Sequence, residues 1–192
     1  MTRKQIIDVL TEAFDANPSV NWVIKNDAKR KKRIRVLSEY AYKTCKARDG
    51  VYLSSNKQGV ALCYNYFCKK EGIADYWNQL ILAINAIGLS RIGEVLKRES
   101  YIKKHRDNKG DFLYFWFFGV SDKGRGSDAA KTLKDDVFRS ADEQQLPIYL
   151  ETSVAKNKRV YERYGFVNYH TWRVEKQGIE LWFMKRPPQP LS

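Results

Sequence analysis

The chain has 192 residues, 14% of them aromatic, and a formal net charge of +13. This length suits one domain that can bury roughly 70% of its unfolded surface, so a real hydrophobic core is expected. Residues 80–89 are interrupted by Asn85 and Gly88 and are too short to span a membrane, so we expect a soluble protein without membrane partners.

The N-terminal segment predicts two helices. Residues 3–15 form an amphipathic pattern in which Asp8 and Glu12 argue against a signal peptide. A turn is expected near Asn17-Pro18, and a charged helix is expected over 27–48. Two helices are therefore expected before the first strand.

A hairpin and a helical segment follow. Residues 50–54 and 59–66 have the composition of strands. Residues 73–105 show two helical patterns that split around Gly88-Leu89-Ser90. We expect this segment to be an insertion of about 72–108 into the core fold.

The most informative segment starts with an apolar strand over 112–120. It leads into the glycine-containing turn 121–127, and a helical pattern begins directly afterwards. The first N–H groups of a helix have no partners within the helix and point outward. They form the positive end of the helix dipole, so an anion placed there is stabilised. A strand, a tight turn and a helix N-terminus are what phosphate binding requires.

Two common phosphate-binding loops do not fit this turn. A P-loop needs a glycine directly before its Lys-Thr pair, but Lys131-Thr132 follows Ala130. A dinucleotide fingerprint needs G-x-G-x-x-G, and the run that starts at Gly124 lacks the last glycine. A different phosphate-binding loop is therefore indicated.

The C-terminal part predicts one more strand and helix before a hairpin. Residues 146–151 form the strand, Thr152 or Ser153 can cap the helix, and Gly165 stops it after Tyr164. The closing hairpin joins strands over 166–174 and 179–184, and residues 187–192 form a tail.

Two motifs together resemble the GCN5-related N-acetyltransferase (GNAT) superfamily. The first is Val-x-x-x-x-Arg-Gly-x-Gly-x-Ala, from Val120 to Ala130, and the second is Asn-x-x-x-Tyr-x-x-x-Gly-Phe, from Asn157 to Phe166. The resemblance implies an α/β fold with a central mixed sheet flanked by helices, and we place the insertion between the third and fourth strands. It implies a single domain over 1–186.

The resemblance also implies the cofactor acetyl-CoA and direct transfer of its acetyl group to an amine. Backbone groups of the strand end would hydrogen-bond the pantetheine arm and the oxyanion, and the turn would hold the pyrophosphate. Asn157 would bind the pantetheine arm. The implied cofactor-binding residues are Phe118, Gly119, Val120, Arg125, Gly126, Ser127, Asp128, Ala129, Ala130 and Asn157.

Two residues are candidates for catalysis. Tyr161 matches the position that donates a proton to the leaving thiolate in many family members, although it could instead be a packed aromatic residue. Glu151, at the strand end, is either a general base or a structural or substrate-orienting carboxylate. Asp128 departs from the pattern, since the family places glycine there; it could point outward, pair with Arg125 or Lys131, or weaken cofactor binding.

Other functions stay open at this stage. The basic run 29–33 could indicate a nucleic-acid-binding protein, although such runs are usually solvated helix faces. A catalytically silent acyl-CoA-binding protein is a further alternative. A small-molecule amine is the favoured acceptor, and a homodimer is possible. Five aromatic residues could line the acceptor pocket or could instead belong to the core. They are Trp22, Tyr40, Tyr64, Trp77 and Tyr114.

The histidines and cysteines indicate no metal site. His105 is expected in a solvated loop and His170 on a strand surface. Cys45, Cys63 and Cys68 are best explained as reduced thiols, which suits a cytoplasmic protein.

Overall fold

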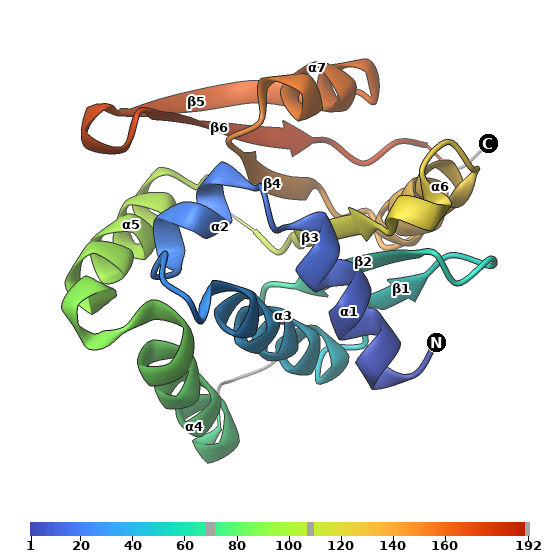
Figure 1. Ribbon diagram of the computed structural model, residues 1–192. Coiled ribbons are helices and arrows are strands. Elements are labelled where there is room, and N and C mark those ends of the chain that lie inside the picture. Colours follow the sequence, from blue (N-terminus) through green and yellow to red (C-terminus); the bar gives the residue numbers. More distant parts are fainter. Residues whose placement is uncertain (68–71, 107–109, 191–192) are drawn as a thin grey trace.

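A six-stranded mixed sheet forms the centre of the computed structural model, which describes residues 1–67, 72–106 and 110–190 (Figure 1). The strand order is β1-β2-β3-β4-β6-β5; β3 and β4 are parallel, and every other neighbouring pair is antiparallel. This confirms the predicted α/β class with a mixed sheet. The strands are β1 (Val51–Leu53), β2 (Gly59–Asn65), β3 (Leu113–Val120), β4 (Ile148–Thr152), β5 (Val167–Val174) and β6 (Ile179–Arg186).

Helices cover both faces of the sheet. α1 and α3 pack on one face of β2 and β3, α6 packs on the other face, and α5 covers the β5–β6 hairpin. The α-helices of the described residues are α1 (Arg3–Ala13), α2 (Pro18–Val23), α3 (Arg30–Lys46), α4 (Ile73–Leu82), α5 (Ile92–His105), α6 (Ala129–Glu143) and α7 (Ala155–Arg163).

The predicted turn near Asn17 is the start of the short helix α2. The Asn17 side chain accepts hydrogen bonds from the N–H groups of Ser19 and Val20, and Pro18 takes the first helical position, where no N–H is needed. The same two residues favour a turn or a helix start, and the interpretation as a turn missed the helix.

The helical insertion lies between β2 and β3, so its predicted place between the third and fourth strands was wrong by one strand. Its predicted split is confirmed. α4 continues as a π-helix (Ala83–Ile87) that ends at Gly88 with φ of +83°, and a 3-10 turn (Leu89–Arg91) leads into α5. Glycine tolerates this positive φ.

The cap predicted for α7 was wrong. Thr152 is the last residue of β4, and Val154 occupies the cap position without a side-chain hydrogen bond. The Ser153 hydroxyl instead hydrogen-bonds to Ser19 of α2, at 2.8 Å between the two oxygens. The predicted stop at Gly165 is confirmed, because its φ is +86° directly after the helix.

The two histidines are less exposed than predicted. His105 stacks on His170 with ring centroids 4.5 Å apart, and Tyr101 hydrogen-bonds to His170 at 3.0 Å. Burial, and then the neighbouring His105, lower the pKa of His170. These contacts join α5 to β5, so the insertion is packed on the closing hairpin. Cys45 and Cys63 are free and buried, while Cys68 lies outside the described residues.

A β-bulge in β3 determines which of its side chains face α6 on one side of the sheet and which face α1 on the other. Leu62 pairs with Phe117 and Cys63 pairs with Phe115, so Trp116 is the extra residue. One extra residue exchanges the two faces of a strand. Phe115 therefore packs with the α6 side before the bulge, Phe117 packs with the α1 side after it, and Phe118 returns to the α6 side.

Gly119 faces α1 at very short range, and this gives a stability prediction. A Cβ at Gly119 would lie 2.9 Å from the Cβ of Ala13, so α1 would have to shift. We expect Gly119→Val to destabilise the fold by about 1–3 kcal/mol through overpacking, measured by urea unfolding. Gly93→Ala is the control, since nothing lies within 4 Å of its added Cβ; equal effects of both variants would contradict the close packing.

Candidate cofactor and active site

β3 and β4 separate after a short parallel contact. Their paired positions are Leu113 with Ile148 and Tyr114 with Tyr149, although β3 continues to Val120 and β4 to Thr152. The backbone of the last β3 residues is therefore not paired with β4. The two strands therefore diverge towards their carboxyl ends.

A cavity of about 240 Å³ lies at this divergence, between β3, α6 and α7. Five of the proposed site residues line it, including Asn157 and Tyr161 of α7 and Phe118 of β3. The full lining is Phe115, Phe118, Val120, Ala130, Lys134, Asn157, Val160, Tyr161 and Tyr164.

The turn before α6 has the geometry of an anion-binding loop. Gly126 has φ of +80°, and no atom lies within 4 Å of where its Cβ would be. The Ser127 hydroxyl accepts a hydrogen bond from the N–H of Ala129, whereas the N–H groups of Gly126 and Ala130 have no partner within the described chain. Open space and free N–H donors at a 15-residue helix fit a pyrophosphate.

Asp128 does not pair with either predicted partner. Its side chain is exposed at the cap position of α6 and makes no ion pair with a described residue. Arg125 pairs instead with Asp122, at 2.7 Å between nitrogen and oxygen, and both side chains are exposed. The outward orientation was one of the predicted alternatives, and it leaves the backbone of the turn accessible.

Tyr161 combines a packed ring with a free hydroxyl. Its ring contacts Phe166 and Phe115, with centroids 5.4 and 6.2 Å away. Tyr161 lines the cavity, and its hydroxyl has no hydrogen-bond partner among the described residues. Burial, and then Cys63 and Tyr164, raise the pKa of Tyr161. The hydroxyl therefore keeps its proton, which a proton donor requires.

Glu151 is engaged on both oxygens. Arg106, at the end of α5, donates to Oε1 at 2.9 Å, and the Tyr114 hydroxyl donates to Oε2 at 2.6 Å. The Arg106 and Glu151 side chains are only 4% and 3% exposed. Tyr114 also lies 4.3 Å below the Arg106 guanidinium. These contacts fit the structural alternative for Glu151 better than a free carboxylate.

The sequence interpretation missed four of the cavity residues. Lys134 follows Ala130 by four positions, Val160 follows Asn157 by three, and Tyr164 follows Tyr161 by three, so helical spacing could have identified them. Phe115 could not be placed, because the bulge at Trp116 determines its face. Lys134 adds a cation to the cavity that can face a phosphate.

A second cavity of about 380 Å³ lies between α2, the insertion and the β5–β6 turn. Arg91 of the insertion forms part of its wall and donates to the carbonyls of Trp22 and Ile24, at 2.6 Å each. The insertion therefore borders this cavity. The lining residues are Pro18, Asn21, Trp22, Arg91, Gln177, Gly178 and Ile179.

Two arginines at the start of α3 form ion pairs with carboxylates. Arg30 pairs with Asp15, and Arg33 pairs with Asp27 at 2.8 Å. The opposite face of the helix buries Ile34. The basic run is thus partly neutralised, which does not favour nucleic-acid binding.

Comparison with known proteins finds a sequence relationship over part of the chain. No family model matches the chain. An uncharacterized N-acetyltransferase of Schizosaccharomyces pombe is 33% identical over 93 residues, which are 47% of this chain and 37% of that protein. The chain therefore matches well under two thirds of that relative's length.

Several solved structures resemble almost the whole chain, and two acetyltransferases are examples. One is the histone acetyltransferase HPA2 and related acetyltransferase of Corynebacterium glutamicum, with a TM-score of 0.69, 22% identity, and coverage of 100% of this chain and 96% of that one. The other is arylalkylamine N-acetyltransferase 2 of Aedes aegypti, with a TM-score of 0.63, 15% identity, and coverage of 97% and 94%. The chain therefore has the fold of these acetyltransferases, and it carries two motifs that resemble those of the GCN5-related N-acetyltransferase superfamily.

Proposed function

We propose that the protein is an acetyl-CoA-dependent N-acetyltransferase that acts on a small amine. The observation that carries this proposal is the cavity at the divergence of β3 and β4, where Asn157, Tyr161 and the α6 N-terminus meet. The cavity, the free N–H groups and Lys134 fit the parts of coenzyme A, which are an arm with amide groups and several phosphates.

The residues divide into binding and proton transfer. The turn from Arg125 to Ala130 would hold the pyrophosphate, and Asn157 would hydrogen-bond the pantetheine arm beside the unpaired β3 backbone of residues 118–120. Bound acetyl-CoA would supply the acetyl group as a thioester. The Tyr161 hydroxyl would give its proton to the departing sulfur, since its pKa is raised by burial.

Glu151 has an orienting role in this proposal. Its two oxygens accept hydrogen bonds from Arg106 and Tyr114, so neither is free to take a proton from an amine. The carboxylate instead fixes the end of β4 beside the divergence. The helical insertion thereby supports the active site through Arg106.

The second cavity is the proposed acceptor site. It is formed by α2, by Arg91 of the insertion and by the closing hairpin, so it is open to a ligand from several elements. Its volume suits a small molecule rather than a folded partner. The Aedes aegypti neighbour is named for arylalkylamines, which are small amines of this kind.

Calorimetric titration with acetyl-CoA tests the cofactor site. We expect Asn157→Ala to weaken binding by about 3- to 10-fold through loss of one hydrogen bond. Gly126→Glu should abolish measurable binding, because it adds a carboxylate next to the phosphates at a φ of +80° that glycine tolerates best. Glu162→Gln is the matched control, since Glu162 is exposed on α7 and does not line the cavity.

Failure of the wild-type protein to bind would refute the proposal. Binding without release of thiol across a panel of small amines would instead identify a catalytically silent acyl-CoA-binding protein. Equal affinities for the Asn157 and Glu162 variants would remove Asn157 from the cofactor site.

A further inference from the structure

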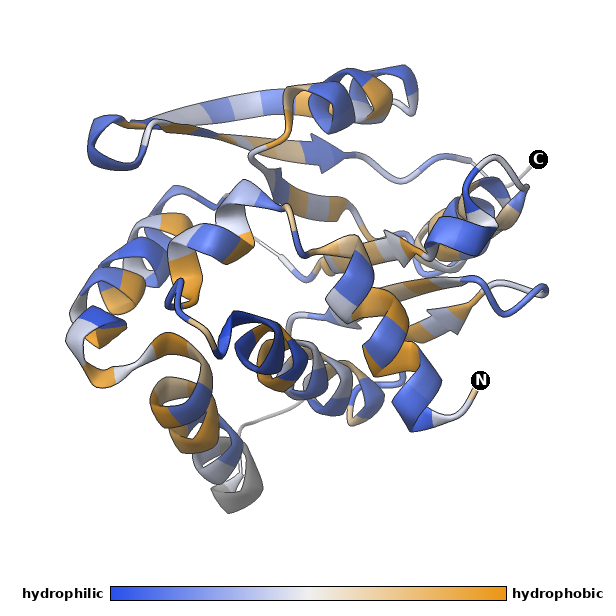
Figure 2. Cartoon of the chain, in the orientation of Figure 1, coloured by the Kyte–Doolittle hydropathy of each residue, from blue (hydrophilic) through white to orange (hydrophobic). Residues whose placement is uncertain are grey.

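The outer face of α4 carries a stripe of exposed apolar side chains. Their positions repeat every four residues on two adjacent rows, so they form one continuous surface on the helix. Figure 2 shows this apolar helix at the edge of the molecule. The α4 stripe consists of Tyr76, Trp77, Leu80 and Ile81 of α4 and Ile84 of the π-helix that continues it, and these side chains are 47–62% exposed.

Apolar exposure continues across the bend into α5. Leu89 is 74% exposed and Leu96 is 63% exposed. Within the described chain no single helix could cross a membrane, although the bent pair 76–87 and 89–105 is long and apolar enough in sum, with an angle of 100° between its halves. Contiguous apolar surface of this kind marks an interaction site.

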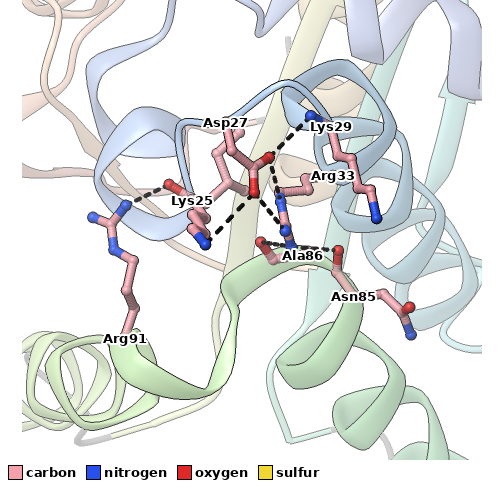
Figure 3. Close-up of polar contacts among 8 residues, drawn as sticks. Lys25, Asp27, Lys29, Arg33, Asn85, Ala86 and Arg91 are labelled. Carbon is pink, nitrogen blue, oxygen red and sulfur yellow. Dashed lines mark hydrogen bonds and ion pairs between the residues drawn. The ribbon is translucent and has the colours of Figure 1, made fainter.

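Polar contacts hold the bend on the body of the protein (Figure 3). Arg33 donates to the carbonyls of Asn85 and Ala86 at 3.0 and 3.4 Å and pairs with Asp27. Hydrogen bonding to Arg33 lowers the pKa of Asp27 to about 2. Arg91 anchors the other side of the bend on α2. The α4 stripe is therefore presented by a fixed support.

Lysine side chains lie around the bend that follows the stripe and on α5. The Lys25 Cδ lies 3.8 Å from the position that a Cβ would take on Gly88 at the bend, and its Nζ lies 3.8 Å from Asp27. Lys29 lies on the exposed start of α3 beside Arg33 (Figure 3). Lys97 follows Leu96 and is exposed, and neither Lys29 nor Lys97 pairs with a described carboxylate. The nearby acids Asp27 and Glu94 are already paired with Arg33 and Lys176.

Charge decides between the possible occupants of the stripe. A second copy would bring another net charge of +13 to the contact, which opposes association. An anionic membrane surface offers the opposite charge and an apolar layer directly beneath it. Tyr76 and Trp77 are also of the residue types that favour the boundary between lipid and water.

We propose that the α4 stripe docks on an anionic membrane surface, with Trp77 and its apolar neighbours inserted among the lipids and the lysines on the headgroups. This replaces the expectation of no membrane contact. The helices lie on the membrane and do not cross it, because α5 carries charges such as Lys97, Lys103 and Lys104 that would be costly within hydrocarbon.

Co-sedimentation with vesicles tests this proposal. The wild-type protein should bind vesicles of phosphatidylcholine with phosphatidylserine and should not bind phosphatidylcholine alone. The variant Trp77→Ser/Leu80→Ser/Ile81→Ser should lose affinity by a factor on the order of 100 or more, because three apolar side chains no longer leave water. Val167→Ser is the control, since Val167 is 61% exposed on β5, away from the stripe.

Tryptophan fluorescence gives an independent readout. Binding should shift the emission to shorter wavelength in the wild-type protein, and Trp77→Phe should remove most of that shift. All substituted side chains are exposed, so the variants should fold, which circular dichroism would verify.

The proposal fails if the wild-type protein binds neither vesicle, binds both equally, or binds as well after the triple substitution. A concentration-dependent dimer that the triple substitution abolishes, without vesicle binding, would assign the stripe to a second copy. A complex with a folded protein in place of vesicle binding would likewise overturn it.

Discussion

Replacing Arg106 by methionine is expected to lower the free energy of unfolding by about 3–5 kcal/mol, because Glu151 would remain buried without its cation. Both side chains are at most 4% exposed, with 2.9 Å between nitrogen and oxygen. The guanidinium also lies over the rings of Tyr66, Phe112 and Tyr114. The loss should therefore exceed that of any exposed ion pair.

Urea unfolding at neutral pH measures this effect. The matched control is Arg173→Met, which removes an exposed pair with Glu180 and should cost less than about 1 kcal/mol. The double variant Arg106→Met/Glu151→Leu should recover part of the stability, because no buried charge remains unpaired. Equal costs for Arg106→Met and Arg173→Met would show that Glu151 finds another partner or water.

The Arg106 contact also shows where sequence reasoning stops. Arg106 and Glu151 are 45 positions apart, and Arg106 stands in the polar run 103–108, which predicts a solvated loop. Its burial depends on how the insertion packs on the sheet. No local pattern encodes that packing, so Glu151 could be placed at the strand end without its partner being found.

Much of the lining of the cavity between β3, α6 and α7 was predictable, because it depends on local sequence features. The α6 turn and the face of α7 that bears Asn157 and Tyr161 are local features, set by glycine conformations and helical spacing. The bulge at Trp116 adds one residue to β3 and has no such signature. The faces of Phe115 and Phe117 therefore became clear only from the strand register.

Tyr161→Phe should lower the turnover number for acetyl transfer by about 100-fold or more, the usual effect of losing a general acid. The affinity for acetyl-CoA should stay nearly unchanged, since the ring still packs on Phe115 and Phe166. Single-turnover thiol release with an amine found in the screen, together with calorimetry, separates these two effects. Tyr164→Phe is the matched control, because it removes another hydroxyl from the same cavity.

The pH dependence sharpens this test. Burial raises the pKa of Tyr161, so its proton is lost only above the ordinary tyrosine range of about pH 10. If Tyr161 is the donor, the wild-type rate should show no decline from this group between neutral pH and about pH 10, and the variant should be slower throughout. A turnover number of the Tyr161→Phe variant within about 3-fold of wild type would be no larger an effect than a neutral surface substitution gives. Tyr161 would then be a packing residue, and solvent would donate the proton to the leaving thiolate.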